Sequence, residues 1–506
     1  MKRIYFIFIA LICFLTASAQ EKLGIANSNY SSTNSIYLNP ASSVDCRTLM
    51  QLNLVGLNIY MMNNQAYLPK FNVWDASKGD MQDPKIKTTG FKKFLDVKAE
   101  VNAPTFILSN KEIGIGFFIR GRAEASIKNI PAELAQLLVQ TKIDTSSQFN
   151  IDLKNTRVSE MSWVEYGINF GKMYFKHGKK LIAWGGNLKY LTGINLAYGN
   201  IFRLNANVSD TQFDVQNLRA KVRYNQPGWN AGRGVGLDIG ITYKKMLNYV
   251  DTYFSNSQKS NCKYIDYKYK VGVSLLDLGA IRFTNKTFKG DISGSTTIND
   301  YKHTNIDSII RADFNLTQQL NEPILASLPT AISLQGDLNL GHHFYVNGTW
   351  IQGITAARII GVQKAALISV APRFETRNIE IAVPVTFHRY IYPQVGAAIR
   401  FRTLVIGMDN ILPFIAHTNT YGANFYFNLG ISIFKNPKCK KSSPRYNPPK
   451  IKYEGYTFLS GRNKKKSVSA NGQGQAPERT NGRKGRKSSG KKGKKKGVFK
   501  KRSQKL

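Results

Sequence analysis

The chain has 506 residues, of which 42% are hydrophobic, and a formal net charge of +40. Beyond its N-terminus it has no apolar run of about eighteen residues, which excludes an ordinary transmembrane helix but not a membrane barrel, whose short strands alternate in polarity. The charge is uneven, because residues 435–506 hold 25 Lys or Arg and two Glu and so carry +23 of it.

The N-terminus has the layout of a secretory signal. A basic pair, Lys2-Arg3, precedes an apolar run, Ile4–Leu15, and small residues follow up to Ala19. This order predicts a cleaved signal peptide over residues 1–19 and export from the cytoplasm.

A polar, turn-forming stretch, NSIYLNPAS at residues 34–42, comes before the first expected strand. Its proline fixes one φ angle and restricts the preceding asparagine to extended geometry, and that asparagine can satisfy nearby backbone groups. Two interpretations stay open: residues 20–46 form a hatch or plug inside a barrel, or they form a solvated turn leading into strand one. For the hatch, the motif residues are Asn34, Tyr37, Asn39, Pro40 and Ala41.

The segments that follow alternate with period two. In VGLDIGITY, residues 235–243, apolar side chains alternate with Gly, Asp and Thr. The same split recurs over residues 332–340 and 379–388, and residues 423–433 place an apolar row opposite Asn, Gly and Ser. Each expected strand has one apolar and one polar face, which fits a soluble sandwich and a membrane barrel equally.

Connection lengths separate these two folds. About sixteen strands are expected, and short turns alternate with long loops at residues 62–101, 127–160, 247–262 and 295–329. This asymmetry is typical of bacterial outer-membrane barrels. We therefore predict an all-β, transmembrane antiparallel β-barrel of about 14–16 strands over residues 47–434, located in the cell outer membrane, with the long loops outside and both termini in the periplasm.

The polar strand faces supply candidate lumen residues, namely Asp238, Lys244, Asp337, Glu380, His388, Arg400 and Arg402. Glu380 begins one expected strand and Arg402 ends the next, so we expect these two to pair near the periplasmic rim. Such a pair fixes strand register or the hatch more often than it recognises a substrate. Both roles stay open.

The sequence carries no G-x-S-x-G motif, P-loop or zinc-spaced Cys/His cluster. His342 and His343 fall together in an expected turn, where adjacent side chains point apart. We therefore expect no catalytic residue, no metal site and no cofactor, and we predict that the chain is not an enzyme.

The cysteines suggest one crosslink. Removal of the signal leaves Cys46, Cys262 and Cys439, an odd number for an oxidising compartment. Cys46 lies just before the first strand and Cys439 just after the last, and these strands are neighbours in a closed barrel. We hypothesise a disulfide between Cys46 and Cys439.

Residues 435–506 begin with a Pro-rich linker and continue with dense Lys and Arg, which predicts a disordered, basic, periplasmic tail. Expected partners are outer-membrane lipid for the barrel and, for the tail, peptidoglycan or an acidic periplasmic partner. A merely solubilising tail is the alternative. No nucleic-acid partner is expected for an exported chain, and the oligomeric state stays open.

The segment ANSNYSSTNSIYLNPASSVD resembles the N-terminal signature of barrels related to the long-chain fatty-acid transporter, in which Asn-Pro-Ala follows a run of small and polar residues. More closely, LGIANSNY, SIYLNPAS, IPAELAQLL and SWVEYGINFGK make the mature chain similar to an uncharacterised outer-membrane barrel family, recognised as a domain of unknown function. The transporter resemblance implies a hatch over roughly residues 25–45 and lateral exit of hydrophobic substrates. The transporters' substrate residues have no visible match, so no substrate is implied.

Two functions are therefore expected. The first is an outer-membrane barrel that binds or passes a small molecule, a hydrophobic one included, through a hatch-plugged lumen. The second is a non-transporting scaffold or envelope anchor whose basic tail contacts peptidoglycan or a partner protein.

Overall fold

The computed structural model describes residues 22–80, 82–87, 93–110, 112–130, 149–209, 212–250, 265–299, 314–356 and 359–433. The expected signal peptide, the basic tail, Cys262 and Cys439 lie outside these residues. Within the described ranges, no helix has the length and apolar character needed to span a membrane.

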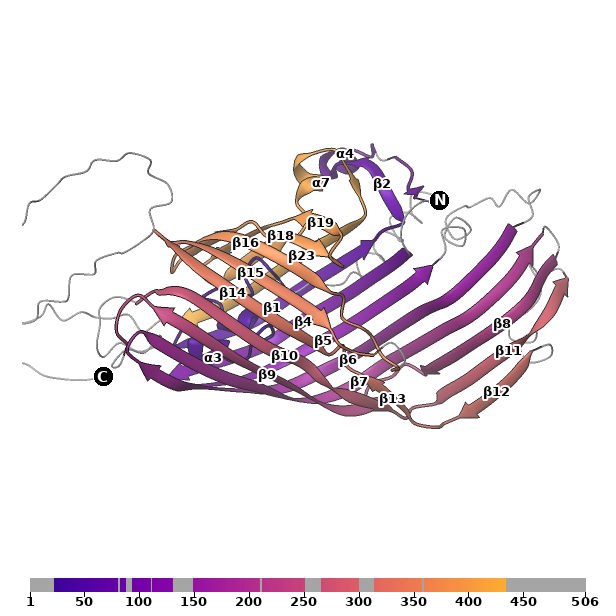
Figure 1. Cartoon of the computed structure of the whole chain (residues 1–506), viewed down its shortest axis with the longest axis horizontal. Helices are drawn as coiled ribbons and strands as arrows, with labels where there is room; N and C mark the ends of the chain where they lie inside the picture. Colours follow the sequence, from indigo (N-terminus) through magenta and orange to yellow (C-terminus); the bar gives the residue numbers. More distant parts are fainter. Residues whose placement is uncertain are drawn as a thin grey trace, which may run out of the picture. The chain divides into compact units, whose positions relative to one another are not determined.

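Most of the described chain forms one antiparallel sheet that closes on itself (Figure 1). Its long, uninterrupted strands are β1 (Met50–Asn63), β4 (Lys93–Asn110), β5 (Ile113–Ile130), β6 (Phe149–His177), β7 (Lys180–Val208), β15 (Phe344–Gly353), β16 (Leu367–Glu375) and β23 (Gly422–Ile433). The others are β8 (Gln212–Asn225), β9 (Gly232–Met246), β10 (Tyr267–Phe283), β11 (Thr287–Asn299), β12 (Asn315–Leu320), β13 (Ile324–Ser327), β14 (Ala331–Gly341), β17 (Ile379–Ala382), β18 (Val385–His388), β19 (Tyr392–Val395), β20 (Ala397–Phe401) and β21 (Leu404–Met408).

The barrel closes between its first and last strands. β1 pairs with β23 from Met50↔Ile433 to Met62↔Gly422, and it pairs with β4 on its other side. Several short strands continue one another across interruptions, so the described residues make a closed barrel of 14 antiparallel wall strands. The prediction of an all-β antiparallel barrel of about 14–16 strands is confirmed.

Two pairs of expected strands merge into single wall strands. β8 and β9 both pair with β7, and β11 pairs with β8 while β10 pairs with β9. Residues 226–231 and 284–286 therefore interrupt wall strands without reversing the chain. A period-two pattern restarts after such an interruption, so the sequence pattern counts two strands where the barrel has one.

Short turns gather at one end of the barrel, called the turn end here; the opposite end is the loop end. The prediction that the connection at residues 247–262 starts at the same end as the other long loops is wrong. The Met246 amide donates to the Lys179 carbonyl over 2.8 Å, and the Val250 amide donates to the Gly178 carbonyl over 2.8 Å, so this connection leaves from the turn end. The reason is the merging of β8 and β9, which moves this connection to the other end; the merging of β10 and β11 restores the expected end for the next one.

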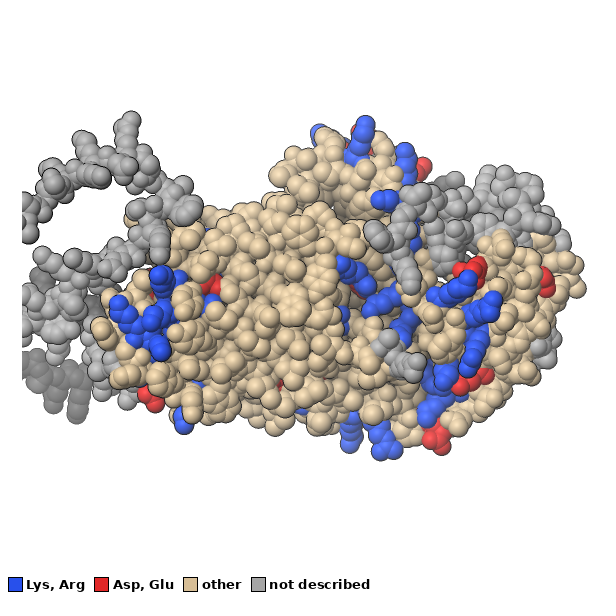
Figure 2. Space-filling model, in the orientation of Figure 1, with Lys and Arg blue, Asp and Glu red and all other residues tan. Residues whose placement is uncertain are grey.

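The apolar strand faces point outward. On β9, Val235 is 66% exposed and Ile239 and Ile241 are also exposed, whereas Asp238 and Thr242 are buried. Figure 2 shows the central part of the visible wall almost free of charged side chains, which gather toward the two ends. A soluble sandwich would bury its apolar faces, so this arrangement is that of a membrane barrel of the outer-membrane type.

The wall is uneven in height. β6 and β7 have 29 residues each, while β20 and β21 have five each. On the low side, five short elements form a small body at the loop end that we call the cap (Figure 1, top): β2 (Ala66–Phe71), α4 (Val73–Ser77), β3 (Lys85–Ile86), α7 (Leu412–Ile415) and β22 (Thr418–Thr420).

Candidate functional site: the filled lumen

Residues 22–48, called the N-terminal segment here, occupy the barrel interior. Every one of them is buried, and they contain two single-turn helices, α2 (Ser32–Ser35) and α3 (Ser42–Asp45). Their side chains and carbonyls bond to strands on all sides of the barrel. The segment then leads directly into β1.

The Asn-Pro-Ala motif lies in a seat made by wall glycines. A Cβ atom on any of these glycines would clash with residues 39–43, and they lie on five consecutive neighbours in the wall, β5, β6, β7, β9 and β10: Gly114, Gly171, Gly185, Gly240 and Gly272. At Gly185, for example, the added atom would be 2.6 Å from the Pro40 carbonyl oxygen. The wall is thus shaped to fit one position of the motif.

Asn39 joins this motif to two wall strands. Its Nδ2 donates to Gln335 Oε1 on β14 over 3.0 Å and to the Ile241 carbonyl on β9 over 3.2 Å. Its Oδ1 accepts from the Ala41 amide over 3.1 Å, which holds the chain in the turn around Pro40. One side chain therefore fixes both the local turn and its place in the lumen.

Neighbouring carbonyls of the segment accept hydrogen bonds from the wall. Asn187 Nδ2 donates to the Ile36 carbonyl, Ser274 Oγ to the Leu38 carbonyl and Asn169 Nδ2 to the Pro40 carbonyl, over 3.1, 2.6 and 3.2 Å. These three donors lie on β7, β10 and β6. Because they satisfy carbonyls that no sheet ladder uses, the segment stays irregular while it is buried.

Of the other two motif residues, Asn34 bonds within the segment and Tyr37 contacts β4 and β5. Asn34 accepts from Lys22 Nζ over 3.2 Å and donates to Ser31 Oγ over 2.8 Å, both within the segment. The Tyr37 hydroxyl lies 2.9 Å from Thr105 Oγ1, and the Arg120 guanidinium lies 4.5 Å from the centroid of the Tyr37 ring.

At the turn end the segment is held by charged groups. Asp45 Oδ1 lies 2.7 Å from Lys244 Nζ, and Arg47 pairs with Asp266. Ser28 Oγ donates to Glu380 Oε2 over 2.6 Å. The Asn29 amide donates to Glu375 Oε1 over 2.8 Å.

Most of the expected lumen residues point inward and are ion-paired. Asp238 pairs with Lys189 over 2.7 Å, Asp337 with Arg373 over 2.6 Å, Glu380 with Arg400 over 2.8 Å, and His388 Nε2 lies 3.1 Å from Asp96 Oδ2. The expected pairing of Glu380 with Arg402 is wrong. Arg402 is exposed at a positive φ in the turn after β20, which takes it off the alternating face that Arg400 occupies.

Cys46, near the end of the N-terminal segment, has a buried thiol. Its Sγ lies 3.7 Å from the Ser28 carbonyl, to which it donates. Burial, with the neighbouring Asp45 carboxylate, raises the pKa of the thiol to about 12. Because Cys439 lies outside the described residues, the disulfide stays a prediction.

A buried ionic group lies above the segment, toward the loop end, and we call it the charged belt. Its members come from β4, β5, β6, β7, β9 and β10: Glu100, Arg120, Arg122, Glu124, Glu165, Lys189, Asp238 and Asp277. Arg120 lies 2.7 Å from Glu165, and Arg122 lies 2.9 Å from Asp277. Sequence reasoning named only Asp238 among them, although the alternating charges of RGRAE at residues 120–124 were a usable signal.

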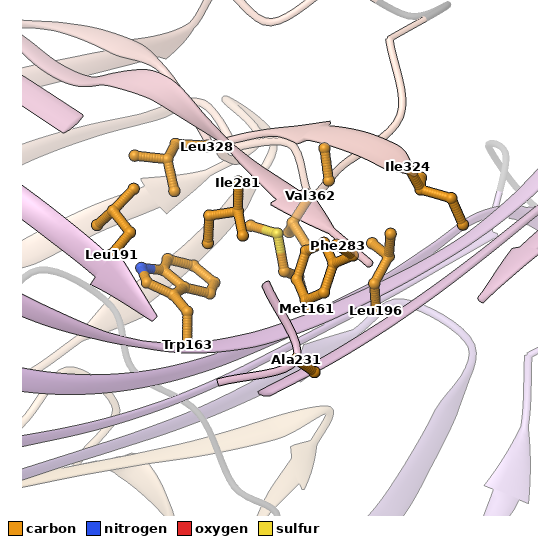
Figure 3. Close-up of a cluster of buried hydrophobic side chains, with 11 residues drawn as sticks. Met161, Trp163, Leu191, Leu196, Ala231, Ile281, Phe283, Ile324, Leu328 and Val362 are labelled. Carbon is orange, nitrogen blue, oxygen red and sulfur yellow. The ribbon is translucent and has the colours of Figure 1, made fainter. Parts of the chain in front are cut away.

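Beyond the belt lies an apolar cluster (Figure 3) formed by Met161, Trp163, Leu191, Leu196, Ala231, Ile281, Phe283, Ile324, Ala326, Leu328 and Val362. Trp163 connects the two layers, because its Nε1 donates to Glu165 Oε1 over 2.9 Å and the Arg122 guanidinium lies 4.6 Å from the centroid of its ring. From turn end to loop end, the lumen therefore holds the segment, the belt and the cluster.

One small cavity of about 50 Å³ remains beside these layers, lined by residues that include Tyr60, Asp96, Glu124, Leu367 and His388. In the part of the chain that the structure describes, no three His, Cys, Asp or Glu side chains are grouped to hold a metal ion.

Comparisons with known proteins give a family and a set of distant folds. The profile of a family described as "Family of unknown function (DUF5723)" matches residues 40–409. No curated protein matches the sequence.

Solved structures with a similar fold include a TodX monoaromatic hydrocarbon channel (deltaS2S3 mutant), 9% identical, covering 79% of this chain and 93% of that one, with a TM-score of 0.39. A FadL homologue of Pseudomonas aeruginosa is 9% identical over 82% of this chain and 97% of that one, with a TM-score of 0.21. The outer membrane protease OmpT of Escherichia coli is 9% identical over 76% and 95%, with a TM-score of 0.18. The activities of these proteins are not carried over to this chain.

Proposed function

The chain belongs to the family of unknown function DUF5723, and on that premise we propose that it is an outer-membrane barrel that binds or passes a small molecule, with the N-terminal segment as its hatch. In this proposal the turn end, where β1 begins and β23 ends, faces the periplasm and the loop end faces outward. The chain performs no covalent chemistry.

The observation that carries the proposal is the kind of contact between the segment and the wall. Apolar side chains of the segment, such as Ile25, Leu38 and Val44, pack on the wall. Besides these, single hydrogen bonds and ion pairs join the segment to many strands, such as Asn39 with Gln335 and Asp45 with Lys244. Water can replace each such contact at a net cost of about 0.5–1.5 kcal/mol for a neutral hydrogen bond. These contacts lower the cost of moving the segment below that of a plug held by apolar packing alone, for which water is no substitute.

The glycine seat adds a defined closed position. A hatch that opens must return to the same place, and the five glycines leave room in the wall for residues 39–43 at the position they occupy. Polar contacts that water can replace, together with a fitted seat, favour a segment that moves.

The layers above the segment favour a small molecule with an apolar part. The belt has five acids and three bases, and two lysines outside it lie next to its remaining acids, Lys22 at 3.9 Å from Glu100 and Lys98 at 3.3 Å from Glu124. Together these groups present little unbalanced charge to a solute. The apolar cluster offers a desolvated surface, and two of its members, Leu328 and Val362, come from connections between strands (Figure 3). Connections shift more readily than paired strands, so they are the natural place for an entry route.

A scaffold function is the second candidate, and the height of the wall favours it. A strand of 29 residues is about 95 Å long, whereas the apolar band of an outer-membrane barrel is about 25 Å tall. Even when tilted, β6 and β7 therefore reach far beyond the membrane. Such a sheet suits contact with another macromolecule.

Reconstitution into liposomes tests the proposal. The wild-type chain is compared with Gly185→Ala, whose new methyl group pushes against Pro40, and with Gly199→Ala on the same strand, where nothing lies within 4 Å of the added atom. We expect wild type and Gly199→Ala to be closed to ions and to take up small apolar probes slowly. Gly185→Ala is expected to conduct ions and to take up the probes faster.

Folding of all three proteins is checked by heat-modifiable migration on a gel. If all three are folded and neither conduct ions nor take up any probe, transport is rejected and the scaffold function is retained.

A further inference from the structure

The outer face of the low side of the barrel carries a concave apolar groove. It has a volume of about 270 Å³ and is lined by Ala397, Ile399, Phe401, Leu404, Ile406, Gly407, Met408 and Ile411, with no charged residue among them. By comparison, an apolar cavity of about 150 Å³ is large enough to bind benzene. The groove therefore has room for a hydrocarbon chain.

The groove exists because the wall stops early on this side. β21 has only five residues, the wall strand made of β19 and β20 spans only Tyr392–Phe401, and after Met408 the chain does not rise further as a strand. It turns at Ile411, whose amide donates to the Val395 carbonyl over 2.8 Å, and enters α7 of the cap. The hairpin of β20 and β21 thus forms the floor of the groove, and Ile411, which leads into α7 of the cap, lies at its upper edge.

The cap presents large apolar side chains to its surroundings. Trp74 is 62% exposed and Ile415 is 68% exposed. Trp74 Nε1 donates to the Phe414 carbonyl over 3.0 Å, which joins α4 to α7 and keeps the indole on the surface. Exposed Asp75 and His417, 2.7 Å apart, give the same body a polar edge.

These features continue the lipid-facing surface of the barrel. The outward apolar row of β20 and β21 passes through Ile411 to Phe414 and Ile415 without a charged residue. Tryptophan with one apolar face and one polar edge favours the headgroup level of a membrane. A separate protein partner would compete with lipid for a surface that already adjoins the lipid-facing wall.

We propose that this groove binds one alkyl chain of a membrane lipid and that the cap rests on the membrane surface, with Trp74 at headgroup level. The site lies outside the barrel and does not depend on whether the lumen transports anything. It would hold the low side of the wall at a fixed depth in the membrane.

The position of Trp74 can be measured in nanodiscs that hold one chain each and phospholipids brominated either near the headgroup or near the chain end. Subtracting the fluorescence of Trp74→Phe from that of the wild type isolates the Trp74 signal. We expect strong quenching by the shallow bromines, weak quenching by the deep ones and shielding from aqueous acrylamide. Quenching by acrylamide without quenching by lipid would overturn the proposal.

Lipid retention tests the groove itself. Native mass spectrometry of the detergent-released protein is expected to show one retained phospholipid on the wild-type chain. Ala397→Trp should fill the groove and abolish retention, while Ala423→Trp, at an exposed alanine on β23, should leave it unchanged. Equal retention in both variants contradicts a built site, and a dimer in place of a lipid adduct assigns the groove to a second copy of the chain.

Discussion

Asp45 of the N-terminal segment and Lys244 of β9 form an ion pair with 2.7 Å between their charged atoms, and both side chains are almost fully buried. Lys244 Nζ also donates to the Asp45 carbonyl over 3.2 Å. The residue that ends α3 is therefore tied to the wall through both its side chain and its backbone. Asp45 directly precedes Cys46 in the chain, so we expect a substitution in this ion pair to change the reactivity of the Cys46 thiol.

Replacing Lys244 by Gln should loosen the segment. Removing one partner of a buried pair costs about 3–5 kcal/mol, and Lys270, 4.0 Å from the other Asp45 oxygen, reduces that loss. In Cys262→Ser/Cys439→Ser protein, in which Cys46 is a free thiol, we expect alkylation of Cys46 to become at least about tenfold faster, since about 1.4 kcal/mol is a factor of ten. Lys245→Gln, which makes the same charge change on the outer side of β9, should leave the rate unchanged. If both variants react alike, the pair does not hold the segment.

The pH dependence of Cys46 alkylation separates a moving hatch from a fixed seal. In Cys262→Ser/Cys439→Ser protein, a thiol with a pKa of about 12 reacts in place through a thiolate fraction that rises steadily up to that pH. If the segment opens first, the exposed thiol has an ordinary pKa near 8.5, and the rate should level off above about pH 9. We expect the levelling off. A rate that still climbs tenfold per pH unit above pH 9.5 would show that the segment stays seated.

The raised pKa of Cys46 also predicts the direction in which the stability of the protein changes with pH. Because the folded-state pKa of Cys46 is raised above its unfolded value, its contribution to stability is fully present below about pH 8.5 and declines as the pH rises toward 12. Cys46→Ala should remove this part of any alkaline loss of stability, measured as the temperature at which the folded band disappears from a gel.

Asn39→Ala should release the segment more than Asn34→Ala does. Asn39 bonds to two wall strands, whereas the bonds of Asn34 to Lys22 and Ser31 remain inside the segment. Losing the Asn39 contacts leaves Gln335 Oε1 without that donor, at a cost of about 1–3 kcal/mol. In planar bilayers we expect brief openings with Asn39→Ala and closed traces with Asn34→Ala. Equal traces would show that the wall contacts of Asn39 do not control closure.

Arg120→Met should destabilise the barrel itself. It removes the cation that lies 2.7 Å from Glu165 and 3.7 Å from Glu100, so it leaves buried carboxylates without compensation. The unfolding temperature on gels should fall clearly, while Arg233→Met, at an exposed position of β9, should leave it within error. A folded band that is equally heat-resistant in both variants would mean that the belt relaxes around the loss.

The hypothesised disulfide has a direct test. Met50, four residues after Cys46, pairs with Ile433, six residues before Cys439. Nonreducing peptide mapping should recover the two cysteines as one linked peptide, lighter by two hydrogens than the reduced pair. Recovery of both as alkylated thiols from denatured protein rejects it.

The sequence was sufficient for the wall but not for the lumen. Period-two alternation at residues 235–243 and 379–388 identified which side chains face inward, and Asp238, Glu380 and His388 are indeed on the buried face. The prediction that Arg402 faces the lumen and pairs with Glu380 was wrong because the alternation ends where a turn begins. The sequence pattern gives about sixteen strands, the upper end of the confirmed range of 14–16, because an interruption such as residues 226–231 has the same polar, Gly- and Pro-containing composition as a true reversal.

The seat of the Asn-Pro-Ala motif was beyond sequence reasoning for a different reason. Gly114, Gly185 and Gly240 are each unremarkable in their own strands. Their shared role exists only when five strands are placed side by side and one segment passes across them. The charged belt is similar, since Arg122 and Asp277 are 155 positions apart and meet only in the closed barrel.

The contrast between β6–β7 and β1–β23 also bears on how the barrel is assembled. β6 and β7 pair along almost their entire length around a two-residue turn. This hairpin can therefore form without contacts from distant parts of the chain. β1 and β23 join residues near 50 to residues near 430, a closure that cannot precede the rest of the wall. We therefore expect folding to start at the tall hairpin and finish at the seam, and the five-strand glycine seat to exist for residues 39–43 only late in insertion.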